Sequence, residues 1–327
     1  MPLIVPSTYT PPLGFSNGHV QTLFPTLFRK VRGVVYQRER IDTPDGDFLD
    51  LDWSPVGSHR LAILSHGLEG NTQRPYMLGM VRALNRRGWD ALAWNYRGCS
   101  GEPNRKLRSY HSGATDDLHT VVRHVLSQRS YREVVLIGFS LGGNITLKYL
   151  GEWGDRVDRR IRKAVAISVP CDLESVAWKL TRPSNRLYLR YFLHSLCEKI
   201  RVKAQLMPEL ISDDGLRGIK TFKEFDDRYT APIHGFQSAE DYWRKCSSRQ
   251  FLPSIRIPTL IVNARNDPLL TASCFPREEA EANPYLFLEM PGSGGHVGFI
   301  AFNERGEYWS EYRALTFISG EQSGSIT

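Results

Sequence analysis

The sequence predicts an α/β fold built on a mostly parallel sheet, and three observations support this. Short apolar segments alternate with segments of helical spacing along most of the 327 residues. Strands that are apolar on both faces are typical of parallel sheets covered by helices on both sides. Near the N-terminus one segment alternates at period two, which predicts an antiparallel hairpin. Between residues 171 and 253 the strand pattern stops, so we also expect a helical insertion.

The N-terminal part is expected to cover the sheet rather than to build it. Residues 1–32 are rich in proline and aromatic residues and should lie as an arm on an apolar surface, with His19 in a packing role. A hairpin should follow, with strands at 33–41 and 48–53. The second strand has the apolar–polar alternation of a half-buried antiparallel strand.

The remaining elements follow from periodicity. We expect strands at 61–64, 89–94, 134–137, 164–169, 258–264 and 285–290, and helices at about 75–87, 114–127, 145–150, 275–281 and 304–317. Residues 1–170 and 254–327 should then form one sheet domain. Residues 171–253 should form a helical cap, whose mixture of aromatic and charged residues suits a lid over a pocket.

Composition and charge exclude several classes of protein. The chain is 41% hydrophobic and 24% charged, which is ordinary for a globular protein. The net charge of +7 is dispersed, and its densest cluster, residues 159–163, is expected in a solvated turn, so nucleic acid is not an expected partner. Weak peripheral contact with a membrane stays open, and the sequence does not decide the oligomeric state.

Cysteine usage and hydropathy indicate the compartment. The five cysteines are widely spaced, without a C-x-x-C pair, which favours free thiols in a reducing compartment. The N-terminus lacks the charged and apolar regions of a signal peptide, and no apolar run approaches the length of a membrane span. The expected location is therefore the cytoplasm.

The most informative stretch is residues 133–151, which contains Gly138-x-Ser140-x-Gly142 between a predicted strand and a predicted helix. This is the pattern of a nucleophile elbow, in which a sharp turn presents a serine hydroxyl to a substrate. Glycines are needed because the strand and helix nearly touch, and a side chain would clash. The alternative is that Ser140 is an ordinary helix N-cap.

A serine hydroxyl needs a base, and the base needs an acid that orients it. Asp267 follows a predicted strand, and His296 lies in the glycine-rich loop after the next one. Loops at the carboxyl ends of parallel strands share one edge of the sheet, so both should meet Ser140. The order Ser, Asp, His is that of the α/β-hydrolase fold. Asp172 is a less favoured alternative for the acid.

Two other expectations concern the surroundings of the serine. The backbone N–H groups of Leu141 and Leu68 should form an oxyanion hole, with Gly67 as the alternative to Leu68. His111 and Asp116 form the H-x-x-x-x-D spacing of some acyltransferases, but a carboxylate is favoured in a first helical turn anyway. No metal-binding or nucleotide-binding motif is present, so neither a metal nor a cofactor is expected.

Several motifs together resemble the YheT-like branch of the α/β-hydrolases, whose members are assigned as esterases. The motifs are SHGLEGN at 65–71, NYRGCSGEPN at 95–104, GFSLGGN at 138–144 and NDP at 266–268, with further likeness at 18–22 and 225–236. The resemblance covers nearly the whole chain. It implies Ser140 as nucleophile, Asp267 as acid and His296 as base.

The sequence thus predicts a serine ester hydrolase, a carboxylesterase that works through an acyl-enzyme. The apolar cap suggests a short- to medium-chain acyl group on a small-molecule or lipid-like ester. Two alternatives remain. One is an acyltransferase that uses the same acyl-enzyme, and the other is a non-catalytic membrane-surface binding protein on a hydrolase scaffold.

Overall fold

The computed structural model describes residues 3–128 and 130–320, and this part of the chain forms a sheet of nine strands in the order β1-β9-β8-β7-β6-β4-β5-β3-β2. The strands are β1 Leu3–Ile4, β2 Gln37–Asp42, β3 Phe48–Ser54, β4 Arg60–Ser65, β5 Asp90–Asn95, β6 Glu133–Phe139, β7 Ile161–Ile167, β8 Thr259–Val262 and β9 Leu286–Glu289. Strand β3 pairs antiparallel with both β2 and β5, and the other described strand pairs are parallel. The predicted mostly parallel sheet with an N-terminal hairpin is confirmed.

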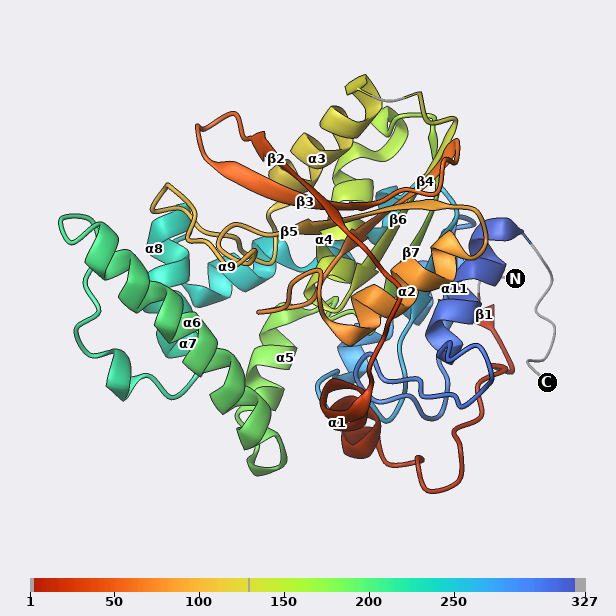
Figure 1. The fold of residues 1–327 in the computed structure, drawn as a ribbon. Helices are drawn as coiled ribbons and strands as arrows, with labels where there is room; N and C mark the ends of the chain where they lie inside the picture. The colour runs from red at the N-terminus through yellow and green to blue at the C-terminus, as the bar shows by residue number, and fades with distance from the viewer. Residues whose placement is uncertain (1–2, 129, 321–327) are drawn as a thin grey trace.

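Helices cover both faces of the sheet, as the apolar strands require. Apart from short 3-10 turns, the helices are α1 Gly18–Phe28, α2 Pro75–Asn85, α3 Thr115–Gln128, α4 Leu141–Trp153, α5 Leu173–Leu180, α6 Arg186–Leu206, α7 Phe222–Phe225, α8 Ala231–His234, α9 Ala239–Cys246, α10 Arg277–Ala282 and α11 Trp309–Ser319, with a π-helical turn at Asp226–Thr230. Helices α3 and α4 pack on one face, and α2 and α11 on the other (Figure 1). The central strands, such as β4, β5, β6 and β8, therefore bury both faces, whereas the edge strand β2 is mostly exposed.

Helices α5 to α9 fill the segment between β7 and β8, where the sequence lacks a strand pattern. They share an apolar cluster of their own, which also receives Leu68 and Leu269 from loops at the carboxyl ends of the strands. In Figure 1 they project to the side of the sheet. The last turn of the segment, Ser248–Ser254, packs against α4.

The hairpin differs from the prediction in one physically informative way. All seven residues of β3 are buried, not every second one. Asp50 and Asp52 are buried because Arg40 and Arg38 of β2 bind their carboxylates in two-point ion pairs. Strand β2 itself begins at Gln37, four residues later than predicted.

The arm at residues 1–32 contains structure that the sequence patterns did not reveal; its first two residues lie outside the described part. Strand β1 pairs in parallel with β9. Helix α1 begins after Asn17, whose side chain accepts hydrogen bonds from the backbone of His19 and Val20, and it includes Pro25. Proline and the lack of an inward apolar stripe concealed this helix.

Two further expectations need correction, and one is confirmed. The basic cluster at 159–163 is not only a turn, because β7 begins at Ile161. The last helix begins at Trp309 and not near 304.

All five cysteines are free thiols, as predicted, and all are buried. Within the described residues no helix combines the length and apolar character needed to cross a membrane.

Candidate active site

Ser140 forms the sharp turn between β6 and α4. It is the single residue between Phe139 and Leu141, with φ 52° and ψ −119°. Its side chain makes no capping hydrogen bond to α4, so it does not act as an ordinary N-cap. A Cβ atom on Gly142 would lie 2.3 Å from the carbonyl oxygen of Ser65 on β4. The turn therefore holds the hydroxyl clear of the helix it precedes.

His296 and Asp267 meet Ser140 at this turn. His296 Nε2 lies 2.8 Å from Ser140 Oγ, and His296 Nδ1 lies 2.8 Å from Asp267 Oδ2. The carboxylate of Asp267 is fully buried, whereas the imidazole is 11% exposed. With the Nδ1 proton donated to the carboxylate, Nε2 is left to accept the serine proton.

Asp267 has hydrogen-bond partners besides His296. Asp267 Oδ1 accepts hydrogen bonds from the backbone N–H groups of Leu269 and Leu270, at 2.8 and 3.3 Å. These two donors hold the carboxylate in one orientation. The alternative acid, Asp172, instead caps α5 by accepting from the N–H of Ser175.

Helix α1 positions the loop of the histidine, which the sequence reasoning missed. The backbone N–H of His296 donates to Thr22 Oγ1 at 2.8 Å, and that of Gly295 donates to Asn266 Oδ1 at 3.0 Å. Gly18 of α1 packs so closely on the same region that a Cβ atom there would lie 1.9 Å from the carbonyl oxygen of Asn266. The only sequence signal for these contacts is that positions 18–22 and 266 fall in motifs of the resembled family.

Two backbone N–H groups beside Ser140 are available for an anion. Those of Leu68 and Leu141 donate to no other group in the described part of the chain. The N–H of Gly67, the alternative donor, is already bound to the hydroxyl of Tyr76 at 2.9 Å. A Cβ atom on Gly67 would lie 3.3 Å from Ser140 Cβ, so this loop passes directly beside the serine.

The loop after β5 supports the loop that carries Leu68. Tyr96 donates its hydroxyl proton to the carbonyl of His66 at 2.5 Å, and its ring packs at a tilt against the His66 ring with 3.9 Å between the ring centroids. Burial lowers the pKa of His66 to about 3, so its ring is neutral. The motif at 95–104 therefore has a clear structural role.

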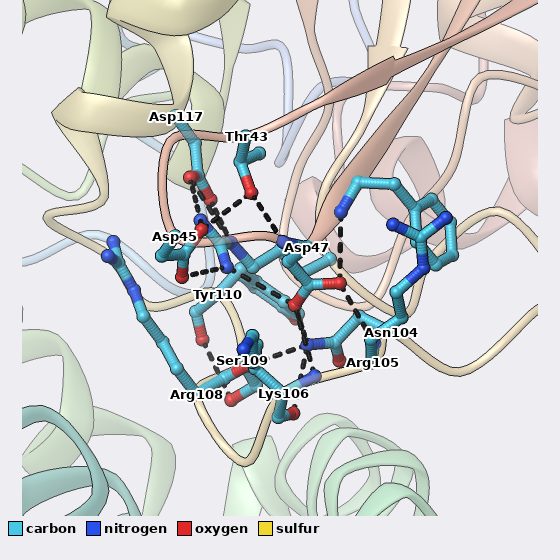
Figure 2. A network of polar contacts seen from close by, with 12 residues as sticks. Thr43, Asp45, Asp47, Asn104, Arg105, Lys106, Arg108, Ser109, Tyr110 and Asp117 are labelled. Carbon is cyan, nitrogen blue, oxygen red and sulfur yellow. Dashed lines mark hydrogen bonds and ion pairs between the residues drawn. The ribbon is translucent and has the colours of Figure 1, made fainter.

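An ionic network fixes the far end of that loop (Figure 2). Arg97 is buried and binds three aspartates at 2.7 to 3.2 Å. These are Asp45, Asp47 and Asp117, which Figure 2 labels. Asn104 donates to the carboxylate of Asp47 at 2.6 Å. Hairpin, loop and helix α3 are thereby joined.

A cavity extends from Ser140 and His296 into the helical segment. Most of its lining is apolar. Helices α5, α6, α7 and α9 contribute Leu173, Val176, Ala177, Leu180, Phe192, Leu196, Phe222, Phe225 and Trp243. Leu68 and Leu141 line it near the serine. Such a cavity can enclose an apolar chain whose polar end lies at Ser140.

One acidic residue lines this apolar cavity. Asp226 accepts hydrogen bonds from Thr230 Oγ1 at 2.6 Å and from Trp243 Nε1 at 2.8 Å. Burial raises the pKa of Asp226 to about 7.

The pair at H-x-x-x-x-D is not assembled as a site. Asp116 binds Arg108 at the surface. His111 lines the cavity, and its Nδ1 accepts a hydrogen bond from the N–H of Gly113 at 3.1 Å. The described residues contain no group of three or more histidine, cysteine or acidic side chains arranged to hold a metal ion.

Comparisons with known proteins bear on the fold and the class of protein. The family model described as "alpha/beta hydrolase fold" matches residues 63–301. "Putative esterase YheT" of Escherichia coli (strain K12) is 37% identical over 298 residues, which is 89% of this chain and 87% of that protein. "Phospholipase ABHD3" of Mus musculus is 30% identical, over 91% of this chain and 74% of its own length.

Two further matches extend the set. "Monoacylglycerol lipase" of Saccharomyces cerevisiae (strain ATCC 204508 / S288c) is 29% identical over 87% of this chain and 64% of its own. Among solved structures, the Pyrococcus furiosus esterase Pf2001 superposes with a TM-score of 0.61 at 18% identity, covering 95% of this chain and 99% of that chain. At that identity the likeness concerns the fold alone.

Proposed function

The chain belongs to the α/β-hydrolase family as an esterase- or lipase-type member, and from this premise we propose that it hydrolyses carboxylic esters through an acyl-enzyme on Ser140. The observation that carries the proposal is the hydrogen-bonded series of Ser140, His296 and Asp267 at the end of an apolar cavity. These are the three groups that activation of a serine hydroxyl needs.

The first half of the reaction forms the acyl-enzyme. His296 Nε2 takes the proton of Ser140 as Oγ attacks the acyl carbonyl. The backbone N–H groups of Leu68 and Leu141 hold the oxyanion. When the intermediate collapses, His296 gives the proton to the departing alkoxide, and an alcohol leaves. Asp267 stabilises the imidazolium throughout.

The second half repeats these steps with water. His296 removes a proton from a water molecule, whose oxygen attacks the acyl carbonyl bound to Ser140. The same two N–H groups hold the second oxyanion. Collapse returns the proton to Ser140 and releases the carboxylic acid.

The cavity supports a substrate with a short- to medium-chain acyl group. Its apolar walls suit an alkyl chain, whose burial is favourable, and they offer few polar groups to a polar acyl part. We take residues 171–253 as the cap that supplies these walls. Two of the relatives are named as a phospholipase and a monoacylglycerol lipase, which supports a lipid-like ester.

Labelling by a fluorophosphonate and turnover of p-nitrophenyl esters test the proposal. Ser140→Ala should lose both. Ser112→Ala is the matched control, because Ser112 is another serine that lines the cavity, and it should still be labelled. Labelling that survives in Ser140→Ala, or is lost only in Ser112→Ala, would contradict the proposal. Added alcohol should leave free acid as the main product, whereas an acyltransferase would form a new ester.

A further inference from the structure

Helix α1 presents its apolar residues to solvent and its polar and small residues to the protein. Gly18, Gln21 and Pro25 are buried. By contrast, Leu27 is 68% and Phe28 is 65% exposed. An ordinary surface helix has the reverse arrangement, with its apolar stripe against the core.

The exposed apolar surface extends beyond the helix. Phe302 is 62% exposed, and its ring packs edge-on against Phe15 and Phe24. We call the group of exposed side chains on this side the α1 patch: Val20, Leu23, Leu27, Phe28 and Phe302. Exposed apolar groups that gather in one place mark an interaction site.

Basic residues adjoin the patch. His19 Nδ1 lies 3.0 Å from the hydroxyl of Tyr188, so the start of α6 lies beside α1, and both are at the lower edge of Figure 1. A second group of exposed residues is basic and is called the basic rim. It contains the basic residues that follow α1 in the sequence and those around the start of α6: Lys30, Arg32, Arg182, Arg186 and Arg190. Within the described residues none of them forms an ion pair.

Acidic residues are missing from both segments. Positions 1–38 and 175–197 contain no aspartate or glutamate. The nearest acidic neighbour of the patch in sequence, Glu304, is followed at once by Arg305. An apolar helix face with an uncompensated basic rim is the combination that binds membrane surfaces containing anionic lipid.

The inner side of α1 touches the candidate active site. Thr22 accepts the hydrogen bond from the backbone of His296, and Gly18 packs on Asn266, next to Asp267. One helix thus has the site's loops on one side and the patch on the other. A helix with side chains is about 10–12 Å across, so anything bound to the patch lies close to the site.

We propose that the α1 patch inserts into the surface of a membrane that contains anionic lipid, with the basic rim on the lipid headgroups. The enzyme would then take its ester from that surface. This uptake rests on the proposed function, whereas the docking does not need hydrolysis. The charges favour a lipid surface over a second copy of this chain, since two basic rims would repel each other.

Sedimentation with vesicles tests the docking in the Ser140→Ala background, where lipid turnover cannot interfere. This protein should sediment with vesicles of phosphatidylcholine and phosphatidylglycerol, and much less with phosphatidylcholine alone. Leu27→Ser with Phe28→Ser should lower binding about tenfold or more, because two apolar side chains are removed from the lipid. Arg186→Gln with Arg190→Gln should lower it about tenfold, and added salt should weaken binding by the parent.

Matched changes elsewhere provide the controls. Leu210→Ser removes a leucine that is 64% exposed outside the patch, and Arg159→Gln with Arg162→Gln removes two exposed arginines outside the rim. These should bind like the parent. Circular dichroism and thermal unfolding verify that each variant folds.

Three results would overturn the proposal. The first is no binding to the anionic vesicles, and the second is equal loss in patch and control variants. The third is a parent that self-associates in sedimentation velocity and becomes monomeric with Leu27→Ser and Phe28→Ser, without vesicle binding. Because Ser140→Ala is used throughout, failure here leaves the hydrolase proposal intact, and failure of that proposal leaves this one testable.

Discussion

Gly138 and Gly142 lie so close together that a Cβ atom on Gly138 would be 2.3 Å from the carbonyl oxygen of Gly142. The contact is between backbone atoms at the end of β6 and in the first turn of α4, so neither side can yield easily. We expect Gly138→Ala to lower the free energy of unfolding by about 3 kcal/mol or more. Urea unfolding followed by circular dichroism measures this.

Gly292→Ala is the control for that substitution. A Cβ atom on Gly292 would have no neighbour within 4 Å. Its effect should stay within about 0.5 kcal/mol. Equal effects at the two glycines would contradict the role of the close contact.

Asp267 should be needed for turnover rather than for substrate binding. Asp267→Asn replaces the oxygen that accepts the Nδ1 proton of His296, so the wrong tautomer is favoured and Nε2 no longer accepts the serine proton. We expect kcat for a p-nitrophenyl ester to fall by roughly 10³–10⁴ with little change in KM. Asp172→Asn should keep most of the activity, because Asp172 caps α5. Similar losses in both variants would count against Asp267.

The cavity should set the length of the acyl chain. Ala177 on α5 is buried and lines the cavity, and Ala177→Phe would fill part of it. In a chain-length series, kcat/KM should fall by about tenfold or more for the longest esters that the parent accepts, and little for the shortest. Glu174→Gln, on the exposed side of the same helix, should leave the series unchanged. A uniform loss at all lengths would argue against this cavity as the acyl site.

Asp226 should make stability depend on pH. Burial raises its pKa to about 7 in the folded protein, from 3.8 in the unfolded chain. Between these values the folded state holds a proton that the unfolded state has released, so stability falls as pH rises from about 4 to about 7. Asparagine does not titrate, so Asp226→Asn lacks this pH dependence. The free energy of unfolding of the variant, minus that of the parent, should therefore increase by up to about 1.4 kcal/mol per pH unit between about pH 4 and about pH 7.

Urea unfolding of both proteins at several pH values measures that difference. The neutral His66 contributes the opposite trend, because its pKa is lowered to about 3 and stability is lost as pH falls below 6.5. It does so equally in both proteins and cancels. A difference that does not vary with pH would show that Asp226 is charged in the folded state.

We expect Lys199 to stabilise the contact between α6 and the loop that carries Leu68. Its Nζ lies 2.9 Å from the buried Glu69 carboxylate and 3.0 Å from Cys99 Sγ. Lys199→Met leaves that carboxylate without its cation and should lower the free energy of unfolding by about 1–3 kcal/mol. Lys199→Met with Glu69→Gln should recover part of the loss, measured in the same urea assay. A double variant as unstable as the sum of its parts would contradict the coupling.

Much of this molecule follows from local sequence patterns. The parallel strands are visible because both their faces are buried, which makes them continuous apolar runs. The turn at Ser140 is visible because its two glycines flank the serine within five residues, although only Gly138 is required by a local contact and Gly142 is required by its contact with Ser65 on β4. The carboxyl ends of parallel strands lie at one edge of the sheet. This rule and the order of Ser140, Asp267 and His296 along the chain were enough to predict that the three side chains meet.

Other features depend on contacts between distant parts of the chain. From the sequence alone, Asp50 and Asp52 on β3 are expected to face solvent. In the structure they are buried, because Arg40 and Arg38 form ion pairs with them. Helix α1 has no inward apolar stripe because its inner side fits against backbone, where Gly18 and Gln21 suit better than leucine. No local pattern contains this information.

The sequence by itself determined the sheet, the elbow and the residue types at the site, because periodicity and short motifs of a few adjacent residues are enough to recognise them. The tertiary structure decided that Thr22 orients the loop of His296, that Tyr76 leaves Leu68 rather than Gly67 as the free donor, and that α1 turns its apolar side outward. These depend on which surfaces meet in three dimensions, and pairing of surfaces across hundreds of residues is fixed only when the whole chain has folded.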